Sequence, residues 1–544
     1  MEKMSGGEAI VRSLIANDVD TVFGMPGVQA YDIFDSLGRH QDKVKTISVR
    51  NEQGAGYMAM GYAKSTGKVG TYCVVPGPGV LNTAAALSSA YSAHAPVLCL
   101  TGQVPSDGIG LGLGHLHELP DQLATLRSLT KWAERINHPS QAPALIAEAF
   151  EKLSTGRIRP VALETPWDVM DSSAAVDIAA ATPRARYQPD DIDSDSIADA
   201  VKLISQAKKP MIAVGCGAIN AGPAVLDLAE RLQAPVVSHR SGRGIVADDN
   251  VHGFNGVQGY ELWPETDLLI GIGSRLELQY DRWVDFPAGM KVIRIDIDPT
   301  QFVHRRPDVG IVGDAVLALA ELNRSLEHKE VSVKANPERL LTAKAKANKK
   351  IHGIQPQVSF LQAIREVMPR DGFISEESSQ VGFSSIFGFP IYEPRTFVTC
   401  SYSGNLGYGF PTALGVKVAN PDKAVVAITG DGGFMFCVNE LATAVQFKIN
   451  LVTLVFNNNC WYNVQRDQEA IFDGRNHVSD LVNPDFVKMA ESFGAIGYRV
   501  STPDALKKVL LKAFAADGPV VIEIPCDKGS ESNPWPLLLP GADL

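Results

Sequence analysis

Short runs rich in β-branched residues alternate with segments of helix length along almost the whole chain, and this alternation constrains the fold more than any other feature. Strands that alternate with helices are typical of parallel α/β domains. A chain of 544 residues is too long for a single hydrophobic core, and about three domains of ordinary size are expected. The sequence therefore predicts an α/β protein with three doubly wound parallel-sheet domains.

Two stretches interrupt the alternation. Residues 171–195 are rich in Ala, Ser, Pro and Asp, and residues 327–356 are charged and rich in Lys and Ala. Both have the composition of interdomain linkers. We therefore expect an N-terminal domain at 1–175, a central domain at 190–328 and a C-terminal domain at 357–544. The predicted strands are 45–49, 69–75 and 96–102, then 210–214, 235–238, 268–272 and 291–297, then 424–429 and 451–456, and the predicted helices include 52–64, 80–93 and 438–447.

The C-terminal third carries the most informative motif. One predicted strand ends at GDGG, residues 430–433, and the next ends at NNN, residues 457–459. Because parallel strands present their carboxyl ends at one edge of the sheet, Asp431 and Asn458 should emerge together, where such sheets bind ligands. A carboxylate and an amide oxygen suit Mg²⁺, which takes its other ligands from phosphate and water. Gly432 and Gly433 should leave the backbone N–H groups at the helix start open to a phosphate.

Either piece alone is compatible with an ordinary turn or helix cap. Together, with a complete helix and strand between them, they resemble the signature of the thiamine-diphosphate enzymes, in which GDG is followed at this distance by NN. Asp431 and Asn458, 27 positions apart, fall on that family's two side-chain metal ligands. The resemblance implies the backbone carbonyl of Cys460 as a third ligand, and thiamine diphosphate and Mg²⁺ as cofactors.

A second resemblance lies in residues 50–56, RNEQGAG, which follow a predicted strand and open a helix. They are similar to the HEQGA segment of acetolactate synthases, with Asn51 in place of His. Glu52 falls on the family's activating acid, which pairs with the aminopyrimidine of the cofactor so that this ring can act as a base. A Glu at a helix N-terminus is otherwise favoured by the helix dipole. In this family the acid and the metal motif come from different subunits, which implies a homodimer or homotetramer with sites at subunit interfaces.

Two further segments of the C-terminal third resemble cofactor loops of the family. Residues 403–411, SGNLGYGFP, are similar to its GTMGxGLP loop. Leu406 falls there on the apolar residue that bends the cofactor, and the carbonyl of Gly404 on the acceptor for its amino group. Upstream, Ser379 and Gln380 fall where the family contacts the diphosphate. The structural alternative for both segments is tight packing of a loop.

Three loops of the N-terminal third, each after a predicted strand, resemble the substrate side of the same cleft. Residues 23–28 contain Pro26, residues 76–82 end in Asn82, and residues 102–105 contain Gln103. We expect Pro26 and Asn82 at the cofactor and Gln103 among the catalytic residues. Val28 and Pro76 depart from the acetolactate synthase pattern, which predicts an altered substrate wall.

His115 and His117 lie in the glycine-rich stretch 108–122. In acetolactate synthases an aromatic–Gln pair stands at about this distance from the preceding loop, and Leu116 and His117 occupy that place here. A His pair on such a loop is more often a surface feature. We take His117 as a candidate catalytic or substrate-contacting group and His115 as the weaker candidate.

Val464 bears on the type of reaction. In decarboxylases of the pyruvate type, a Glu that aligns with Val464 protonates the reaction intermediate, and an apolar side chain cannot do so. An intermediate that is not protonated survives to attack a second carbonyl. We therefore expect Val464 at the cofactor, and a carboligase or acyl transferase of the acetolactate synthase type acting on a 2-oxo acid. The alternatives are a carbon–carbon lyase for a 2-oxo acid or acyl-CoA, and an inactive paralogue, which the presence of Glu52, Leu406, Asp431 and Asn458 argues against.

The central third resembles the domain that carries FAD in acetolactate synthases, and ADP or nothing in related enzymes. The similar segments are 214–218, 273–275, 294–299 and 313–315. Residues 252–256, HGFNG, depart from the family's flavin-contacting GMHG segment, and a lone GxG is weak support for a nucleotide. We therefore do not expect FAD in the central domain, although the resemblance leaves it open.

Charge and hydropathy argue against other kinds of partner. The formal net charge of -11 disfavours nucleic acid, whose phosphates require a basic face. No apolar stretch approaches the ~20 residues of a membrane span, and residues 1–17 lack the apolar core of a signal peptide. The seven cysteines are scattered, without a CxxC pair, as in a reduced core. These features predict a cytoplasmic protein that binds a small molecule.

Overall fold

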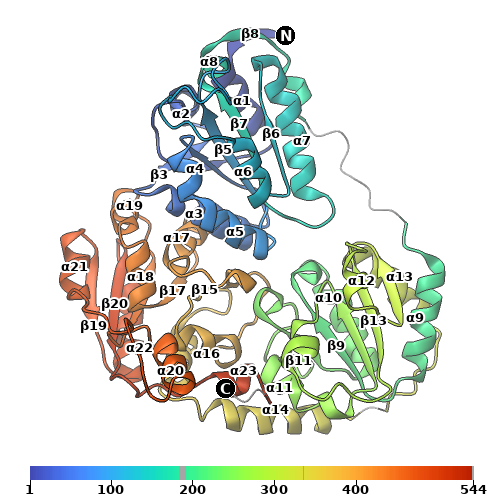
Figure 1. Cartoon of the computed structure of the whole chain (residues 1–544). Helices are drawn as coiled ribbons and strands as arrows, with labels where there is room; N and C mark the ends of the chain where they lie inside the picture. Colours follow the sequence, from blue (N-terminus) through green and yellow to red (C-terminus); the bar gives the residue numbers. More distant parts are fainter. Residues whose placement is uncertain (183–190, 335, 542–544) are drawn as a thin grey trace.

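The computed structural model describes residues 1–182, 191–334 and 336–541. Three six-stranded sheets, each parallel throughout, follow one another along the chain and are flanked by helices (Figure 1). The chain is therefore an α/β protein of three parallel-sheet domains, as predicted. Among the described residues, no helix has the length and apolar character needed to cross a membrane.

The N-terminal sheet has the strand order β3-β2-β4-β5-β7-β6. Alternate residues of its strands face two separate apolar clusters: Phe23 and Val74 lie in one, Val22 and Cys73 in the other. The strands are β2 (Thr21–Gly24), β3 (Lys45–Ser48), β4 (Gly70–Val74), β5 (Val97–Gln103), β6 (Trp132–Arg135) and β7 (Val161–Pro166). The helices are α1 (Gly6–Ala16), α2 (Tyr31–Arg39), α3 (Glu52–Thr66), α4 (Pro78–Asn82), α5 (Ala84–Ser92), α6 (Gln122–Leu129), α7 (Ala142–Ser154) and α8 (Trp167–Asp171). An antiparallel pair, β1 (Glu2–Ser5) and β8 (Ser173–Val176), joins the two ends of this region.

The central sheet has the order β11-β10-β9-β12-β13-β14 and its own apolar core. Its strands are β9 (Pro210–Val214), β10 (Val236–Ser238), β11 (Gly253–Asn255), β12 (Leu268–Ile272), β13 (Lys291–Asp296) and β14 (Val309–Val312). Its helices are α9 (Ser194–Gln206), α10 (Gly222–Leu232), α11 (Gly256–Tyr260), α12 (Gln301–His304) and α13 (Ala315–Leu326), and α14 (Pro337–Ile351) follows.

The C-terminal sheet has the order β16-β15-β17-β18-β20-β19. Its strands are β15 (Phe373–Ser375), β16 (Phe397–Val398), β17 (Val425–Gly430), β18 (Val452–Asn457), β19 (Ile496–Arg499) and β20 (Val520–Pro525). Its helices are α15 (Gln357–Val367), α16 (Gln380–Gly388), α17 (Gly409–Ala419), α18 (Asp431–Phe436), α19 (Glu440–Gln446), α20 (Tyr462–Ile471), α21 (Phe486–Ser492), α22 (Pro503–Phe514) and α23 (Trp535–Leu538).

Helices α3 and α17 pack the N-terminal and C-terminal sheets into one continuous apolar cluster. They cross in direct backbone contact at two glycines. A Cβ added to Gly61 would lie 2.0 Å from the carbonyl oxygen of Thr412, and one added to Gly415 would lie 1.9 Å from that of Met58. Only glycine permits so close a crossing. The position of α3, which begins at Glu52, is therefore tied to the position of α17.

The strand order places a potential binding crevice in each sheet. In every sheet the chain first builds strands to one side and then returns to the other, so two neighbouring strands send their following loops apart. Open α/β sheets bind ligands at such switch points, beyond the carboxyl ends of the strands. The switch points lie between β2 and β4, between β9 and β12, and between β15 and β17.

Two expectations about local structure need correction. The helix predicted over 80–93 is two helices, α4 and α5, which meet at Thr83. The stretch 327–356, expected as a linker, contains the 15-residue helix α14, whose buried side chains Leu340, Ala343, Ala347 and Ile351 recur at helical spacing. Of the other expected linker, residues 183–190 lie outside the described residues.

Candidate active site

Asp431 and Asn458 lie at the ends of two paired strands. Strand β17 ends at Gly430 and β18 at Asn457, and the two strands are neighbours in the sheet. Asp431 is buried, which raises the pKa of its carboxyl group. Its Oδ2 accepts a hydrogen bond of 2.6 Å from Nδ2 of Asn483. The predicted convergence of a carboxylate and an amide at this edge of the sheet is therefore present.

A second carboxylate adjoins this pair. The buried Glu531 accepts from Nδ2 of Asn458 at 2.8 Å, which turns the Asn458 amide so that its Oδ1 receives the backbone N–H of Cys460 at 3.2 Å. Burial, together with the negative charge of Asp431, raises the pKa of Glu531. The cluster is thus rich in negative charge and in hard oxygen atoms, the surroundings in which a divalent cation is stable.

These oxygen donors fit a magnesium ion better than a metal held by protein alone. In the described part of the chain, no three His, Cys, Asp or Glu side chains come together as a metal site. A cation here therefore depends on amide and carbonyl oxygens of the protein and on oxygens of a ligand, which is how Mg²⁺ binds with phosphates. The Sγ of Cys460 is not suited to the role, because burial raises the pKa of this thiol to about 11.

Gly432 and Gly433 face protein side chains in the direction that a Cβ atom would take. A Cβ on Gly432 would lie 2.2 Å from the ring of Trp461, and one on Gly433 would lie 3.0 Å from the carboxyl group of Glu377. This packing is a second reason for glycine at both positions, besides the predicted approach of a phosphate to the backbone N–H groups. The glycines serve the close packing of α18, whose first turn still presents its N–H groups at the edge of the sheet.

Glu377 holds the loop that carries Leu406. It is fully buried, and its carboxylate accepts from the backbone N–H of Gly407 at 2.6 Å and of Gly409 at 2.9 Å. Burial raises the pKa of Glu377 to about 8. Because the same carboxyl group packs on Gly433, the Leu406 loop and the start of α18 are assembled around one side chain.

The neighbouring predicted residues lie at the same edge. Ser379 caps α16 by accepting from the N–H of Gly382 at 3.1 Å, and its Cβ packs against Gly430. Gln380 begins α16 and is buried, and its Oε1 has no hydrogen-bond partner in the structure. A buried amide oxygen without a partner is a group that a ligand can satisfy. Gly404 has φ of +63° and is exposed at the opposite end of the Leu406 loop.

Glu52 lies at the corresponding edge of the N-terminal sheet. It is the first residue of α3 and only 6% exposed. The side chain of Asn51 caps the helix, and Asn82 donates from Nδ2 to Oε2 of Glu52 at 3.0 Å. Two residues predicted from separate motifs, Glu52 and Asn82, are thus in contact. Pro26 lies on the loop after β2, where the adjacent Gly27 packs against Val75 of the loop after β4.

His117 lies against the loops that follow β2 and β4 in the N-terminal domain. Its Nδ1 is 3.0 Å from Oε1 of Gln29, while Nε2 of Gln29 donates to the carbonyl of Leu116 at 2.8 Å. His117 adopts a φ of +67°, and its carbonyl packs directly on Gly77, which itself has φ of +60°. The imidazole is therefore held beside the loops that follow β2 and β4. His115 turns away and packs on Gly108.

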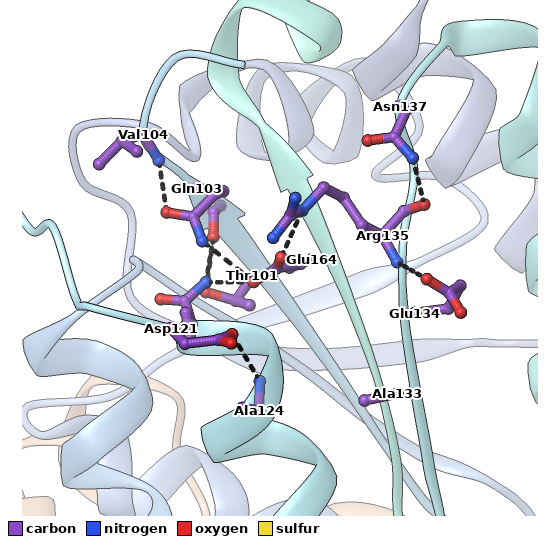
Figure 2. A network of polar contacts seen from close by, with 12 residues as sticks. Thr101, Gln103, Val104, Asp121, Ala124, Ala133, Glu134, Arg135, Asn137 and Glu164 are labelled. Atoms are coloured by element: carbon purple, nitrogen blue, oxygen red, sulfur yellow. Dashed lines mark hydrogen bonds and ion pairs between the residues drawn. The ribbon is translucent and has the colours of Figure 1, made fainter. Parts of the chain in front are cut away.

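Gln103 is committed to a buried polar network (Figure 2). Its Oε1 accepts from the N–H of Val104 at 2.8 Å, and its Nε2 donates to Glu164 at 3.2 Å. Glu164 is completely buried and also accepts from Nε of Arg135 (Figure 2). A further hydrogen bond to it comes from Nε2 of Gln122. Since both ends of the Gln103 amide make hydrogen bonds within the protein, this geometry supports a role in fixing the end of β5.

Val464 belongs to the C-terminal domain, where it lies on α20 with 51% of its surface exposed. The nearby Trp461 covers Gly432, and Asn463 accepts from Nε1 of Trp535 at 2.7 Å. Trp535 begins α23, so the C-terminal tail is packed against the helix that carries Val464. The side chain at position 464 is therefore apolar and has no proton to donate.

A separate cavity of about 330 Å³ opens at the switch point of the central sheet. It is lined by the segments 213–217, 273–275, 295–297 and 313–315, which the sequence had grouped together, and by residues of the other two domains. The basic side chains at its wall are Lys64, Arg157, Arg240, Arg275 and Arg395. Residues 252–256, the segment compared with the flavin contact, do not line it.

The sequence pointed to the segment of Glu377, at 376–380, and to the C-terminal tail 531–544 with Trp535 as a stretch that could close over the site, but it gave no specific role to Asn483 or Glu531. Asn483, whose amide also donates to Asn457 and Asn459, is 52 positions from Asp431, and Glu531 is 73 positions from Asn458. Neither stands in a local pattern.

Comparison with protein families agrees with this geometry. Residues 4–125 match the N-terminal TPP binding domain of thiamine pyrophosphate enzymes, residues 197–322 their central domain and residues 379–524 their C-terminal TPP binding domain. The chain belongs to the thiamine pyrophosphate enzyme family.

Similar proteins span nearly its whole length. The chain is 32% identical to the probable 2-ketoarginine decarboxylase of Pseudomonas aeruginosa, over 96% of this chain and 94% of that protein. It is 32% identical to the acetolactate synthase large subunit of Haemophilus influenzae, over 99% of this chain and 97% of that protein. Identity to the probable acetolactate synthase large subunit of Methanococcus aeolicus is also 32%, over 99% and 94%.

Proposed function

We propose that this protein is a thiamine-diphosphate-dependent carboligase of the acetolactate synthase type that acts on a 2-oxo acid. The observation that carries the proposal is that one chain contains both halves of such a site, each at the edge of its own sheet. Asp431 and Asn458 converge at the end of β17 and β18, and a buried Glu52 stands at the matching edge of the N-terminal sheet. The full-length similarity to acetolactate synthase large subunits supports the same conclusion.

The residues that would hold the cofactor follow from the contacts. Asp431, the Oδ1 of Asn458 and the backbone carbonyl of Cys460 would hold Mg²⁺, with Glu531 orienting the Asn458 amide. The N–H groups of α18, Ser379 and Gln380 would receive the diphosphate. When bound, thiamine diphosphate supplies a carbon nucleophile for the carbonyl of a 2-oxo acid.

Residues of the N-terminal domain would orient and activate the cofactor. Glu52 would hold a proton between its carboxyl group and the aminopyrimidine, with Asn82 fixing the carboxyl group through Oε2. Leu406, on the loop fixed by Glu377, would press the cofactor into its bent form, and Gly404 would accept at its carbonyl. His117 would face the substrate from the wall that Gln103 and Glu164 stiffen.

The two edges are proposed to come from different subunits. In the described structure the hydrogen-bond partner of Glu52 is Asn82 of its own domain, whereas Asp431 is bonded within the C-terminal domain. A homodimer, or a homotetramer built from such dimers, would complete each site. The cytoplasmic location stays a prediction from the sequence.

Carboligation is favoured over carbon–carbon cleavage. Val464 offers no proton to an intermediate, and the two acetolactate synthase large subunits match over 99% of the chain. One similar protein is named a probable decarboxylase, so the lyase outcome is the competing result of the test.

FAD is not part of the proposal. The central cavity is lined by both basic and acidic side chains, and Arg157 and Arg240 are ion-paired with Asp296 and Glu277. A bound flavin would show as visible absorption of the purified protein.

The test is product analysis by NMR. Purified protein is incubated with thiamine diphosphate, Mg²⁺ and carbon-13 pyruvate, first alone and then with a second 2-oxo acid. An acetohydroxy acid as the product supports the carboligase. A free aldehyde as the product of every 2-oxo acid tried would reject it in favour of the lyase.

A further inference from the structure

Three polar side chains of α19 contact the turn that leads into Glu52. Glu440 accepts from the backbone N–H of Arg50 at 3.0 Å and of Asn51 at 2.9 Å. Thr443, one helical turn further on, lies with its Oγ 3.3 Å from the carbonyl oxygen of Ser48, while its one hydroxyl hydrogen goes to Glu440. Gln446 accepts from the guanidinium of Arg50 at 2.6 Å. Two backbone N–H groups of the β3–α3 turn and the guanidinium of Arg50 are therefore held by one helix of the C-terminal domain.

Glu440 is the centre of this contact. It is completely buried, and it also accepts from Oγ of Thr443 at 2.6 Å and from Nδ2 of Asn439 at 3.1 Å. Its carboxyl group lies at the N-terminus of α3, where a negative charge is favourable. Gly54 makes room for it, because a Cβ there would lie 2.7 Å from Oε1 of Glu440. The sequence around Glu52 is thus shaped to receive this side chain.

The placement of Glu440 connects two different catalytic elements. Asn51, whose N–H it binds, directly precedes Glu52 in the chain. On its other side, α19 follows α18, the helix that begins at Asp431, and the N–H of Glu440 donates to the carbonyl of Cys437 at 3.0 Å in the short connection. Under the proposed function, Asp431 and Glu52 of one chain serve two different active sites.

We propose that Glu440 is the positioning residue for Glu52 of its own chain, so that the helix pair α18–α19 at one active site sets the activating acid of the other. The inference rests on the proposed function, because it requires sites shared between two subunits. Glu440 itself touches neither substrate nor cofactor in this account; it acts by fixing the backbone on which Glu52 is carried.

Mixed assemblies distinguish an effect of Glu440 on Glu52 of its own chain from an effect on the active site that contains Asp431 of its own chain. Two forms of the full chain with different affinity tags are produced together, and assemblies that carry both tags are purified. One form contains Asp431→Ala and contributes Glu52; the other contains Glu52→Gln and contributes Asp431. Each mixed dimer then has one intact site and one site with both defects. Glu440→Gln is added either to the form that supplies Glu52 or to the form that supplies Asp431.

The proposal predicts a loss of turnover only when Glu440→Gln is in the form that supplies Glu52, which is the first arrangement. Glu440→Gln beside the working Glu52 should lower kcat at least tenfold, since a displacement of about 1 Å at a catalytic group costs up to ~100-fold. The same substitution beside the working Asp431 should change kcat less than about twofold. Equal losses in both arrangements, or the larger loss beside Asp431, would overturn the proposal.

A second readout excludes a loss of folded protein. The C2 proton of bound thiamine diphosphate exchanges with D₂O at a rate that NMR measures after acid quench. This rate, per bound cofactor, should fall together with kcat in the first arrangement, while the affinity for thiamine diphosphate stays unchanged. Partial unfolding would lower the amount of bound cofactor without changing the exchange rate, and that result would also contradict the proposal.

Further variants sharpen the comparison. Gly54→Ala, placed beside the working Glu52, should reproduce the slow exchange because the new Cβ displaces Glu440. The matched control is Glu230→Gln, the same change of charge at an exposed position of α10, which should leave both readouts unchanged. If the mixed assembly without Glu440→Gln is itself inactive, the shared site of the proposed function fails, and this outcome is distinct from a failure of the Glu440 inference.

Discussion

The crossing of α3 and α17 offers the sharpest test of how the fold positions the site. In Gly415→Ala, the added Cβ would lie 1.9 Å from the carbonyl oxygen of Met58. Ordinary contacts of a carbon atom lie at about 3.5 Å, so the helices would have to separate by roughly 1.5 Å. The obstacle is backbone, and no rotamer change relieves it.

The expected cost can be worked out from opposing effects. Overpacking in a closed core destabilises by about 1–3 kcal/mol, and a contact this short lies at the upper end. Replacing Gly by Ala within a helix returns about 1 kcal/mol. The net loss of unfolding free energy should therefore be about 2 kcal/mol. Turnover should fall as well, because α3 carries Glu52 and α17 follows the Leu406 loop.

The assay is urea unfolding of the variant beside wild type and a matched glycine. Gly38 is also in a helix, α2, but no atom lies within 4 Å of the Cβ it would gain. Gly38→Ala should keep or raise the midpoint of unfolding, and Gly415→Ala should lower it and reduce kcat tenfold or more. A wild-type midpoint and wild-type kcat for Gly415→Ala would refute the reasoning that this backbone contact fixes the two halves of the site.

Three further predictions concern single side chains. Glu52→Gln should bind thiamine diphosphate normally and lose turnover about 10²–10⁴-fold, measured as kcat; retained turnover would contradict the activation role. Asp431→Ala should lose affinity for thiamine diphosphate in titrations with Mg²⁺ present, and unchanged binding would remove the metal assignment. Burial and the neighbouring Arg240 hold the pKa of His239 well below 6.5. Above pH 6.5 this imidazole is neutral in both states, and below it only the unfolded chain gains the proton. Unfolding free energy should therefore fall by up to about 1.4 kcal/mol per pH unit below 6.5, and His239→Gln should flatten that slope; an unchanged slope would show that His239 does not carry it.

Much of the fold could be predicted because strand and helix periods are local. The strand expected at 268–272 is β12 without change, and those at 451–456 and 424–429 shift by one residue at each end. The break between α4 and α5 was not predicted, since Thr83 has no side-chain property that stops a helix by itself. Helix α14 lies within the expected linker 327–356, and its bounds were not predicted because its many Lys residues obscure the apolar face formed by Leu340, Ala343, Ala347 and Ile351.

The candidate site shows a similar division. Asp431 and Asn458 could be paired in advance because strand ends of a parallel sheet share one edge. Glu531 and Asn483 could not, because only tertiary packing brings them to that edge. The direction of a side chain was also hidden: the motif placed Gln103 at the cleft, but Glu164 on the adjacent strand holds its amide. The same holds for Gly432, whose bare face is taken by Trp461.

The most direct test of the central claim is reconstitution of turnover from protein freed of small molecules. The protein is treated with a chelator and dialysed, and 2-oxo acid consumption is measured after adding back thiamine diphosphate, Mg²⁺, both or neither. The account predicts turnover only with both, at a saturating rate that Glu52→Gln and Asp431→Ala do not reach. Turnover in the absence of added cofactor and metal, or its full persistence in both variants, would contradict it.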